Sequence, residues 1–92
     1  MELMYEQTKL GIKMINVKSS NIAAVGWDED HLFIQYNSGN IYMYDGVKKD
    51  KYNQLIQAES KGKFVNAYIK PTYPYQKLTH CFNKNNELVS IL

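Results

Sequence analysis

The sequence has no arginine, and all eleven of its basic residues are lysine. Arginine grips a phosphate or the edge of a guanine with two parallel hydrogen bonds, whereas lysine offers a single point charge. The chain therefore lacks the side chain that most often reads base pairs. We expect no sequence-specific binding to duplex DNA.

Cysteine and long apolar runs are also scarce. Cys81 is the only cysteine, so it cannot form a disulfide within the chain and does not indicate an oxidising compartment. No segment approaches the roughly 18 consecutive apolar residues of a membrane span. The stretch "MELMYEQTKL" has neither the basic start nor the apolar run of a signal peptide. We expect a cytoplasmic protein with no membrane partner.

The composition indicates one globular domain. The 92 residues are 45% hydrophobic and 13% aromatic, with a net charge of +2. A disordered chain would have fewer aromatic residues and a larger net charge. Because a chain of this length cannot divide its core in two, we predict a single domain over residues 1–92.

The middle of the chain has the period of two that is typical of β-strands. Apolar side chains alternate in "NIAAVGWD", and a polar turn separates this stretch from "HLFIQYN". After the break "NSG", the stretch "NIYMYD" has the same alternation. We predict three antiparallel strands joined by short turns.

The register of the second hairpin decides the role of two tyrosines, since a slip of one residue moves a strand's side chains to the other face. A three-residue loop 37–39, with Gly39 as its bulge, pairs Leu32 with Tyr44 and places Tyr42 and Tyr44 on the core face. A two-residue loop would place them on the opposite face, where they could form a platform for a ligand. We favour the three-residue loop because Gly39 stands where a positive φ is needed.

Helical periodicity follows the strands. "VKKDKYNQLIQAES" has apolar residues three and four apart and predicts an amphipathic helix. "SKGKFVNAYIKP" predicts a second short helix, capped by Ser60 and stopped by Pro71. Two close prolines in "KPTYPY" predict an extended turn, and "KLTHCFNKNNELVSIL" predicts two short strands. The fold class is thus α+β: an antiparallel sheet of three to five strands packed against one or two short helices.

Residues 15–73 resemble the KTSC domain, a small module found at the C-terminus of some lysyl-tRNA synthetases and as a stand-alone protein. The matching residues, in order, are Ser19, Ser20, Leu32, Ile34, Tyr36, Gly39, Tyr42, Tyr44, Tyr52, Leu55, Ala58, Ser60, Gly62, Asn66, Ile69 and Tyr73. At Lys48 the family usually has proline. Residues 1–14 and 74–92 lie outside the resemblance as N- and C-terminal extensions. The resemblance implies RNA binding, which the synthetase context suggests.

The residues offer little for catalysis. Ser19 and Ser20 have no histidine placed to activate either hydroxyl. His80 and Cys81 are neighbours on a predicted strand, so their side chains point to opposite faces and cannot easily bind one ion. No glycine-rich phosphate loop is present. We predict no catalytic residue, no metal site, no cofactor and no enzymatic activity.

Lysines and aromatic residues interleave through the predicted helices, as in proteins that hold single-stranded nucleic acids. We predict a binding module for RNA or another nucleotide-containing ligand. The candidate ligand-binding residues are Ser19, Ser20, Lys48, Lys49, Lys61, Lys63, Phe64, Tyr68, Lys70 and Tyr73. In the alternative interpretation these lysines are only a solvated helix face, because the net charge is small for a nucleic-acid binder.

A second hypothesis makes the chain a small self-associating interaction protein of the kind that phages encode. Such a protein would sequester a nucleotide signal or occupy a host protein. Phe33, Ile41 and Met43 form an apolar second face of the predicted sheet, and a chain this short has little left to cover it. This face predicts a homo-oligomer.

Overall fold

The computed structural model describes the backbone of residues 8–82 and 88–91 and the side chains of residues 12–78. Its larger sheet has five antiparallel strands in the order β2-β3-β4-β5-β6. These strands are β2 (Ile15–Asn16), β3 (Ile22–Asp28), β4 (His31–Tyr36), β5 (Ile41–Asp45) and β6 (Tyr75–Lys77).

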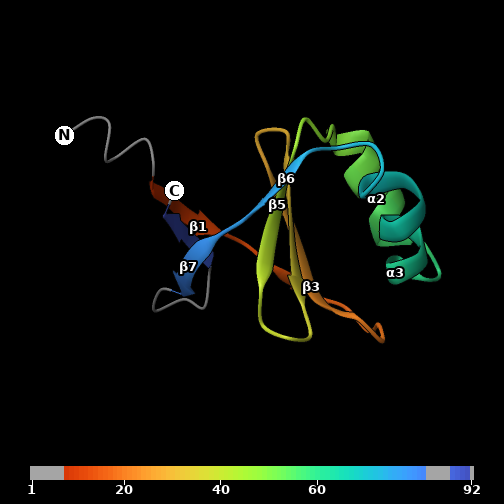
Figure 1. The fold of residues 1–92 in the computed structure, drawn as a ribbon, viewed down its shortest axis with the longest axis horizontal. Helices are drawn as coiled ribbons and strands as arrows, with labels where there is room; N and C mark the ends of the chain where they lie inside the picture. Colours follow the sequence, from red (N-terminus) through yellow and green to blue (C-terminus); the bar gives the residue numbers. More distant parts are fainter. Residues whose placement is uncertain (1–7, 83–87, 92) are drawn as a thin grey trace.

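Helices cover one face of this sheet, and a smaller sheet lies on its other side (Figure 1). The helical elements are α2 (Lys49–Gln57), α3 (Lys61–Phe64) and the π-helix η1 (Val65–Ile69). The smaller sheet has the order β1-β8-β7, formed by β1 (Thr8–Ile12), β8 (Leu88–Ile91) and β7 (Thr79–Phe82). The predicted α+β class, with an antiparallel sheet packed on short helices, is confirmed. In the described part of the chain, no helix has the length and apolar character needed to cross a membrane.

The hairpin of β4 and β5 has the predicted register. Leu32 pairs with Tyr44 and Ile34 with Tyr42. The backbone N–H of Tyr36 donates to the carbonyl of Asn40 over 2.9 Å, and Gly39 has a φ of +99°. The three-residue loop is therefore confirmed, and its glycine adopts the left-handed conformation that other residues avoid.

The larger core lies between the sheet and the helices. Tyr44 is 1% exposed within it, whereas Tyr42 is half-buried at its margin. The other buried members are Ile22, Val25, Leu32, Ile34, Val47, Leu55, Val65 and Ile69. Tyr44 is thus a core residue, and Tyr42 keeps part of its ring accessible.

The second face of the sheet is covered by the chain itself. Phe33 and Ile41 are fully buried against Ile12 and Leu78, and Met43 packs beside them. The exposed apolar face that the sequence predicted is therefore absent, because residues 12–14 cross the sheet. The predicted homo-oligomer stays a prediction, without this patch to support it.

Three strands, β1, β2 and β6, arise where the sequence did not predict them. Part of the predicted extended turn is β6, in which Tyr75 pairs with Tyr44. β6 is an edge strand, and an edge tolerates the preceding proline because only one side of the strand needs hydrogen bonds. β1 pairs with β8, from the opposite end of the chain.

Candidate ligand-binding groove

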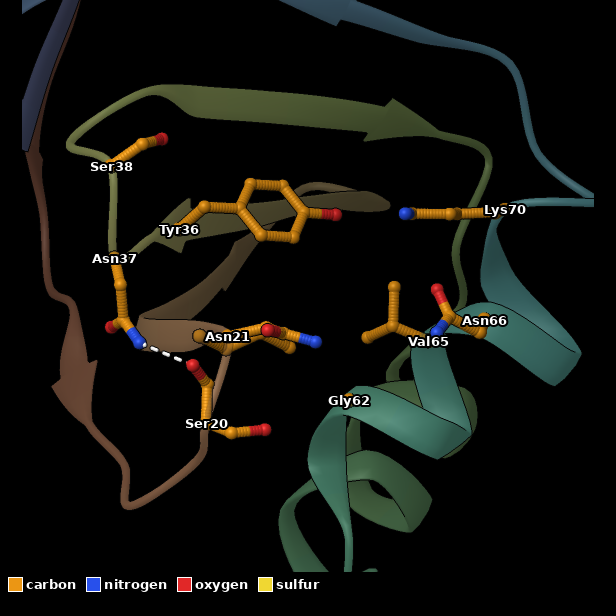
Figure 2. Close-up of a pocket in the computed structure, with 10 residues that line it drawn as sticks. Ser20, Asn21, Tyr36, Asn37, Ser38, Gly62, Val65, Asn66 and Lys70 are labelled. Atoms are coloured by element: carbon orange, nitrogen blue, oxygen red, sulfur yellow. Dashed lines mark hydrogen bonds between the residues drawn. The ribbon is translucent and has the colours of Figure 1, made fainter.

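Two adjoining pockets lie where the β4–β5 loop faces the helices. We call the first the polar pocket. It has a volume of about 330 Å³, and its described lining residues are Ser20, Asn21, Ile22, Tyr36, Asn37, Ser38, Gly62, Val65, Asn66 and Lys70 (Figure 2). We call the second the tyrosine pocket. It has a volume of about 420 Å³, lined by Tyr36, Ser38, Asn40, Tyr42, Tyr44, Lys70 and Tyr75. Because both share Tyr36, Ser38 and Lys70, we treat them as one groove.

One wall of the polar pocket is a tight turn before β3. The Ser19 hydroxyl accepts hydrogen bonds from the backbone N–H groups of Asn21 and Ile22, each over 3.3 Å. Such a bond is the usual way in which serine closes a turn. The Asn37 amide donates to the carbonyl of Ser20 over 2.8 Å (Figure 2). The turn is therefore tied to the β4–β5 loop, and both present short polar side chains to the pocket.

The helical wall begins at Ser60, whose hydroxyl accepts from the backbone N–H of Lys63 over 3.2 Å. This confirms Ser60 as the predicted N-cap. Gly62 follows, and a Cβ there would lie 3.7 Å from both the Asn21 amide nitrogen and the Ser19 hydroxyl. The start of α3 therefore lies beside the turn, with room for a Cβ between them.

The π-helix η1 completes this wall. Its Val65 and Ile69 are buried in the core, whereas Asn66 and Lys70 line the pocket. The Lys70 backbone N–H donates to the carbonyl of Val65 over 2.9 Å, which closes the wider π turn. π turns often occur at functional sites.

The tyrosine pocket is a cluster of stacked rings. Tyr42 and Tyr75 stack with their centroids 5.1 Å apart, and Tyr36 meets Tyr42 edge-on at 5.4 Å. Tyr75 is 60% exposed. One face of the Tyr75 ring is therefore covered by Tyr42, and much of the rest of the ring is open to a ligand.

Lys70 stands at the junction of the two pockets. Its Nζ lies 5.7 Å from the centroid of the Tyr36 ring, and Figure 2 shows the two side chains pointing toward each other from the helical side and from the sheet. A lysine over a ring face is attracted by the π electrons. Among the described lining residues of both pockets, Lys70 is the one charged residue.

The phenols of Tyr36 and Tyr44 in the groove stay protonated at neutral pH. The Tyr36 and Tyr44 hydroxyls share a hydrogen bond of 2.9 Å. Burial raises the pKa of both tyrosines above the usual value of 10.0. A phenol with a raised pKa is a poor base and a poor nucleophile. These hydroxyls can therefore donate and accept hydrogen bonds but do not supply a reactive anion.

Of the predicted ligand-binding residues, Ser20 and Lys70 line the groove and Ser19 closes the turn beneath it. Three other lysines make contacts elsewhere. Lys48 pairs with Asp30 over 2.9 Å, Lys49 lies 5.3 Å from the Trp27 ring, and Lys61 donates to the carbonyl of Ala58 over 2.7 Å.

The remaining predicted residues belong to the helices and to the turn after them. Phe64 and Tyr68 pack with their ring centroids 5.0 Å apart, and Tyr68 is 55% exposed. Lys63 is exposed on α3, and Tyr73 packs against the larger core. We call Phe64, Tyr68 and the neighbouring Lys51 the helix surface, because the Lys51 Nζ lies within 6 Å of both rings, at 5.9 and 5.6 Å.

The sequence did not assign binding roles to most of the groove. Asn21, Asn37 and Ser38 stand in loops, where no periodic signal marks them. Tyr36 and Asn66 carry part of the family resemblance, and this could have singled them out. Tyr75 follows a proline in a stretch that looked like a turn.

A model of the KTSC domain matches residues 18–73 of the chain. The chain belongs to the KTSC domain family. The matched part includes β3, β4, β5 and the helices, and hence both walls of the polar pocket. Tyr75 and the smaller sheet lie outside it.

Relatives of this KTSC chain occur in several bacteria. A protein of Tsukamurella paurometabola is 39% identical over 59 residues, which are 62% of this chain and 88% of that protein. A protein of Stutzerimonas stutzeri is 28% identical over 64 residues, 67% of this chain and 90% of that protein. The crystal structure of a KTSC domain protein from Yersinia pestis is similar with a TM-score of 0.70 and 31% identity, covering 74% of this chain and 99% of that chain.

Proposed function

We propose that this KTSC protein is a non-enzymatic binding module for RNA or another nucleotide-containing ligand, which it holds in the groove. One observation carries the proposal: Lys70 and Tyr36 stand together at the junction of a polar and an aromatic pocket. A nucleotide has the matching parts, namely an anionic phosphate, a polar sugar and a planar base.

The charge of the groove favours an anionic ligand. Within the described part of the chain, Lys70 has no carboxylate partner, and the described lining residues include no acid. A lysine contacts phosphate as a point charge without reading sequence. The ligand would therefore be recognised with little preference for one base.

The aromatic residues supply the second contribution to ligand binding, which is stacking against a base. A base stacked on an aromatic ring contributes about 1 to 3 kcal/mol, and every base has a face that can stack. Tyr75 has the accessible ring, and Tyr42 supports it from behind at 5.1 Å. Both pockets lie within the range of roughly 300 to 1,000 Å³ that is usual for ligand sites.

Binding without catalysis is consistent with the side chains that line the groove. The described lining residues include no histidine, cysteine or carboxylate, and the phenols of Tyr36 and Tyr44 have raised pKa values. A hydrolytic or transfer reaction needs a base or an activated nucleophile. We therefore propose a binding role for the groove, in a protein of the cytoplasm.

Fluorescence anisotropy with a labelled single-stranded RNA tests the proposal. We expect affinities of about 1 to 100 μM, typical of binding that rests mainly on phosphate contacts. Lys70→Gln should weaken binding several-fold. Lys63→Gln is the matched control, because Lys63 is exposed and lies outside both pockets. Equal binding by the two variants would show that the groove is not the site.

A self-associating interaction protein is the second candidate, and the helix surface is the observation that favours it. Tyr68 is 55% exposed there beside Phe64 and Lys51. Exposed aromatic rings are enriched at protein interfaces. Light scattering of the wild type and of Tyr68→Ser tests this alternative. A dimer that Tyr68→Ser dissociates would support it, and a monomer at high concentration would argue against self-association.

A further inference from the structure

The polar pocket offers more hydrogen-bonding groups than a single phosphate needs. The side chains of Ser20, Asn21 and Asn66 line it, and within the described part of the chain none of them has a hydrogen-bond partner. All three are uncharged, and each side chain can both donate and accept. They stand on both walls, since Ser20 and Asn21 belong to the turn and Asn66 to η1.

The order of groups along the groove matches a two-nucleotide step of a strand. The tyrosine pocket suits a base, Lys70 at the junction suits the phosphate that follows, and the polar pocket then receives the sugar of the next nucleotide. A second phosphate is a poor occupant of the polar pocket, because Lys70 is its one cation among the described lining residues.

We infer that the polar pocket reads the sugar, so that the groove binds single-stranded RNA more tightly than single-stranded DNA. This inference rests on the proposed function. The 2′-hydroxyl is the group that distinguishes ribose from deoxyribose, and it both donates and accepts hydrogen bonds. Neutral amides and a serine hydroxyl are suited to it. When a deoxyribose occupies the same place, the side chains of Asn66 and Ser20 form hydrogen bonds with water instead of with a 2′-hydroxyl.

The preference is modest. Asn66 and Ser20 are exposed, so they do not suffer the penalty of a buried polar group when the 2′-hydroxyl is missing. One net hydrogen bond between neutral partners corresponds to about a three- to tenfold difference in affinity.

The test compares an oligoadenylate RNA of about eight nucleotides with the matching oligodeoxyadenylate, both binding the full chain at one salt concentration. The wild type should bind the RNA about three- to tenfold more tightly. Asn66→Ala should weaken RNA binding and leave DNA binding unchanged, so that the ratio approaches one. Asn53→Ala is the matched control, because Asn53 is exposed on α2 away from the groove. Thermal melts check that each variant is folded.

The outcomes separate this inference from the proposed function. Equal binding of the two strands, with both weakened by Lys70→Gln, overturns the inference and supports the proposed function. A ratio that none of Asn66→Ala, Ser20→Ala and Asn21→Ala changes also overturns it, since another part of the chain then reads the sugar. If the wild type binds neither the RNA nor the DNA, both this inference and the proposed function are overturned.

Discussion

The hydroxyl groups of Tyr36 and Tyr44 lie 2.9 Å apart; both residues line the tyrosine pocket, and Tyr44 is also a buried member of the larger core. Tyr44 is 1% exposed. The pair therefore couples the wall of the candidate site to the packing between sheet and helices. A change in the protonation of either phenol should affect the stability of the whole fold.

Alkaline pH should destabilise the protein. The raised pKa values mean that the native phenols keep their protons where those of the unfolded chain ionise, near pH 10. Above this pH the unfolded state binds fewer protons, so the free energy of unfolding falls as pH rises. For Tyr44 the slope approaches about 1.4 kcal/mol per pH unit. Urea unfolding between about pH 8 and pH 11 measures it.

Tyr44→Phe is the informative variant for this pH dependence. It removes one ionisable phenol from the core, so stability should fall less steeply with pH than in the wild type. Tyr68→Phe is the control, because Tyr68 is 55% exposed. An unchanged slope in Tyr44→Phe would mean that other groups cause the alkaline unfolding.

Truncation should distinguish the two tyrosines of β5. Tyr44→Ala should cost about 3 to 5 kcal/mol, because it removes a buried aromatic ring from a small domain. Tyr42→Ala should cost less, since Tyr42 is only half-buried, but it removes the ring that supports Tyr75. Chemical denaturation measures both. Similar losses of stability in the two variants would contradict the burial difference.

Local signals in the sequence predicted the parts of the fold that form from neighbouring residues. Gly39 specified the β4–β5 loop, and that loop fixed the register which buries Tyr44. Ser60 specified the start of α3. In each case a backbone conformation or a single hydrogen bond within a few residues carries the signal.

Contacts between distant segments could not be predicted in this way. β6 is held by β5, and Ile12 covers Phe33 from the start of the chain. The groove itself combines Ser20, Tyr36 and Asn66 from three separate elements. Hydrophobic periodicity indicates which face of each helix or strand is buried. It does not indicate which turn of a helix lies opposite which loop. The sequence therefore identified Ser20 and Lys70 as separate candidates and did not bring them together.

Proline at position 48 should stabilise the protein. Lys48 precedes α2 with a φ of −75°, close to the angle that the proline ring imposes. Proline there restricts the unfolded chain and should add about 0.4 to 1 kcal/mol to the free energy of unfolding. The lost ion pair with Asp30 is exposed and contributes little. Thermal melts of Lys48→Pro and the control Lys48→Ala separate the two effects. A lower melting point for Lys48→Pro than for Lys48→Ala would contradict this reasoning.

RNA binding should weaken as salt rises, and Lys70 should account for part of the slope. Each phosphate neutralised on a single strand contributes about −0.7 to the slope of log K against log salt. Lys70→Gln should therefore make the slope less steep by about that amount, and Lys63→Gln should not change it. Anisotropy titrations at several salt concentrations measure the slopes. A tight affinity that persists at high salt would contradict binding through phosphate.

The last prediction concerns the crossing of residues 12–14 over the main sheet. A Cβ on Gly26 would lie 2.7 Å from the Met14 sulfur and 2.9 Å from the carbonyl oxygen of Lys13. The methionine side chain can move, but the carbonyl belongs to the backbone, so the crossing segment must shift. Gly26→Ala should therefore cost about 1 to 3 kcal/mol, as overpacking usually does.

Gly62→Ala makes the same chemical change where there is room. A Cβ at Gly62 would lie at ordinary contact distance, 3.7 Å from the nearest side-chain atoms, and alanine favours a helix over glycine by up to about 1 kcal/mol. This control should melt at or above the wild-type temperature. If Gly26→Ala also melts at or above the wild-type temperature, residues 12–14 are not held against the sheet. The cover over Phe33 would then have to come from another part of the chain or from a partner.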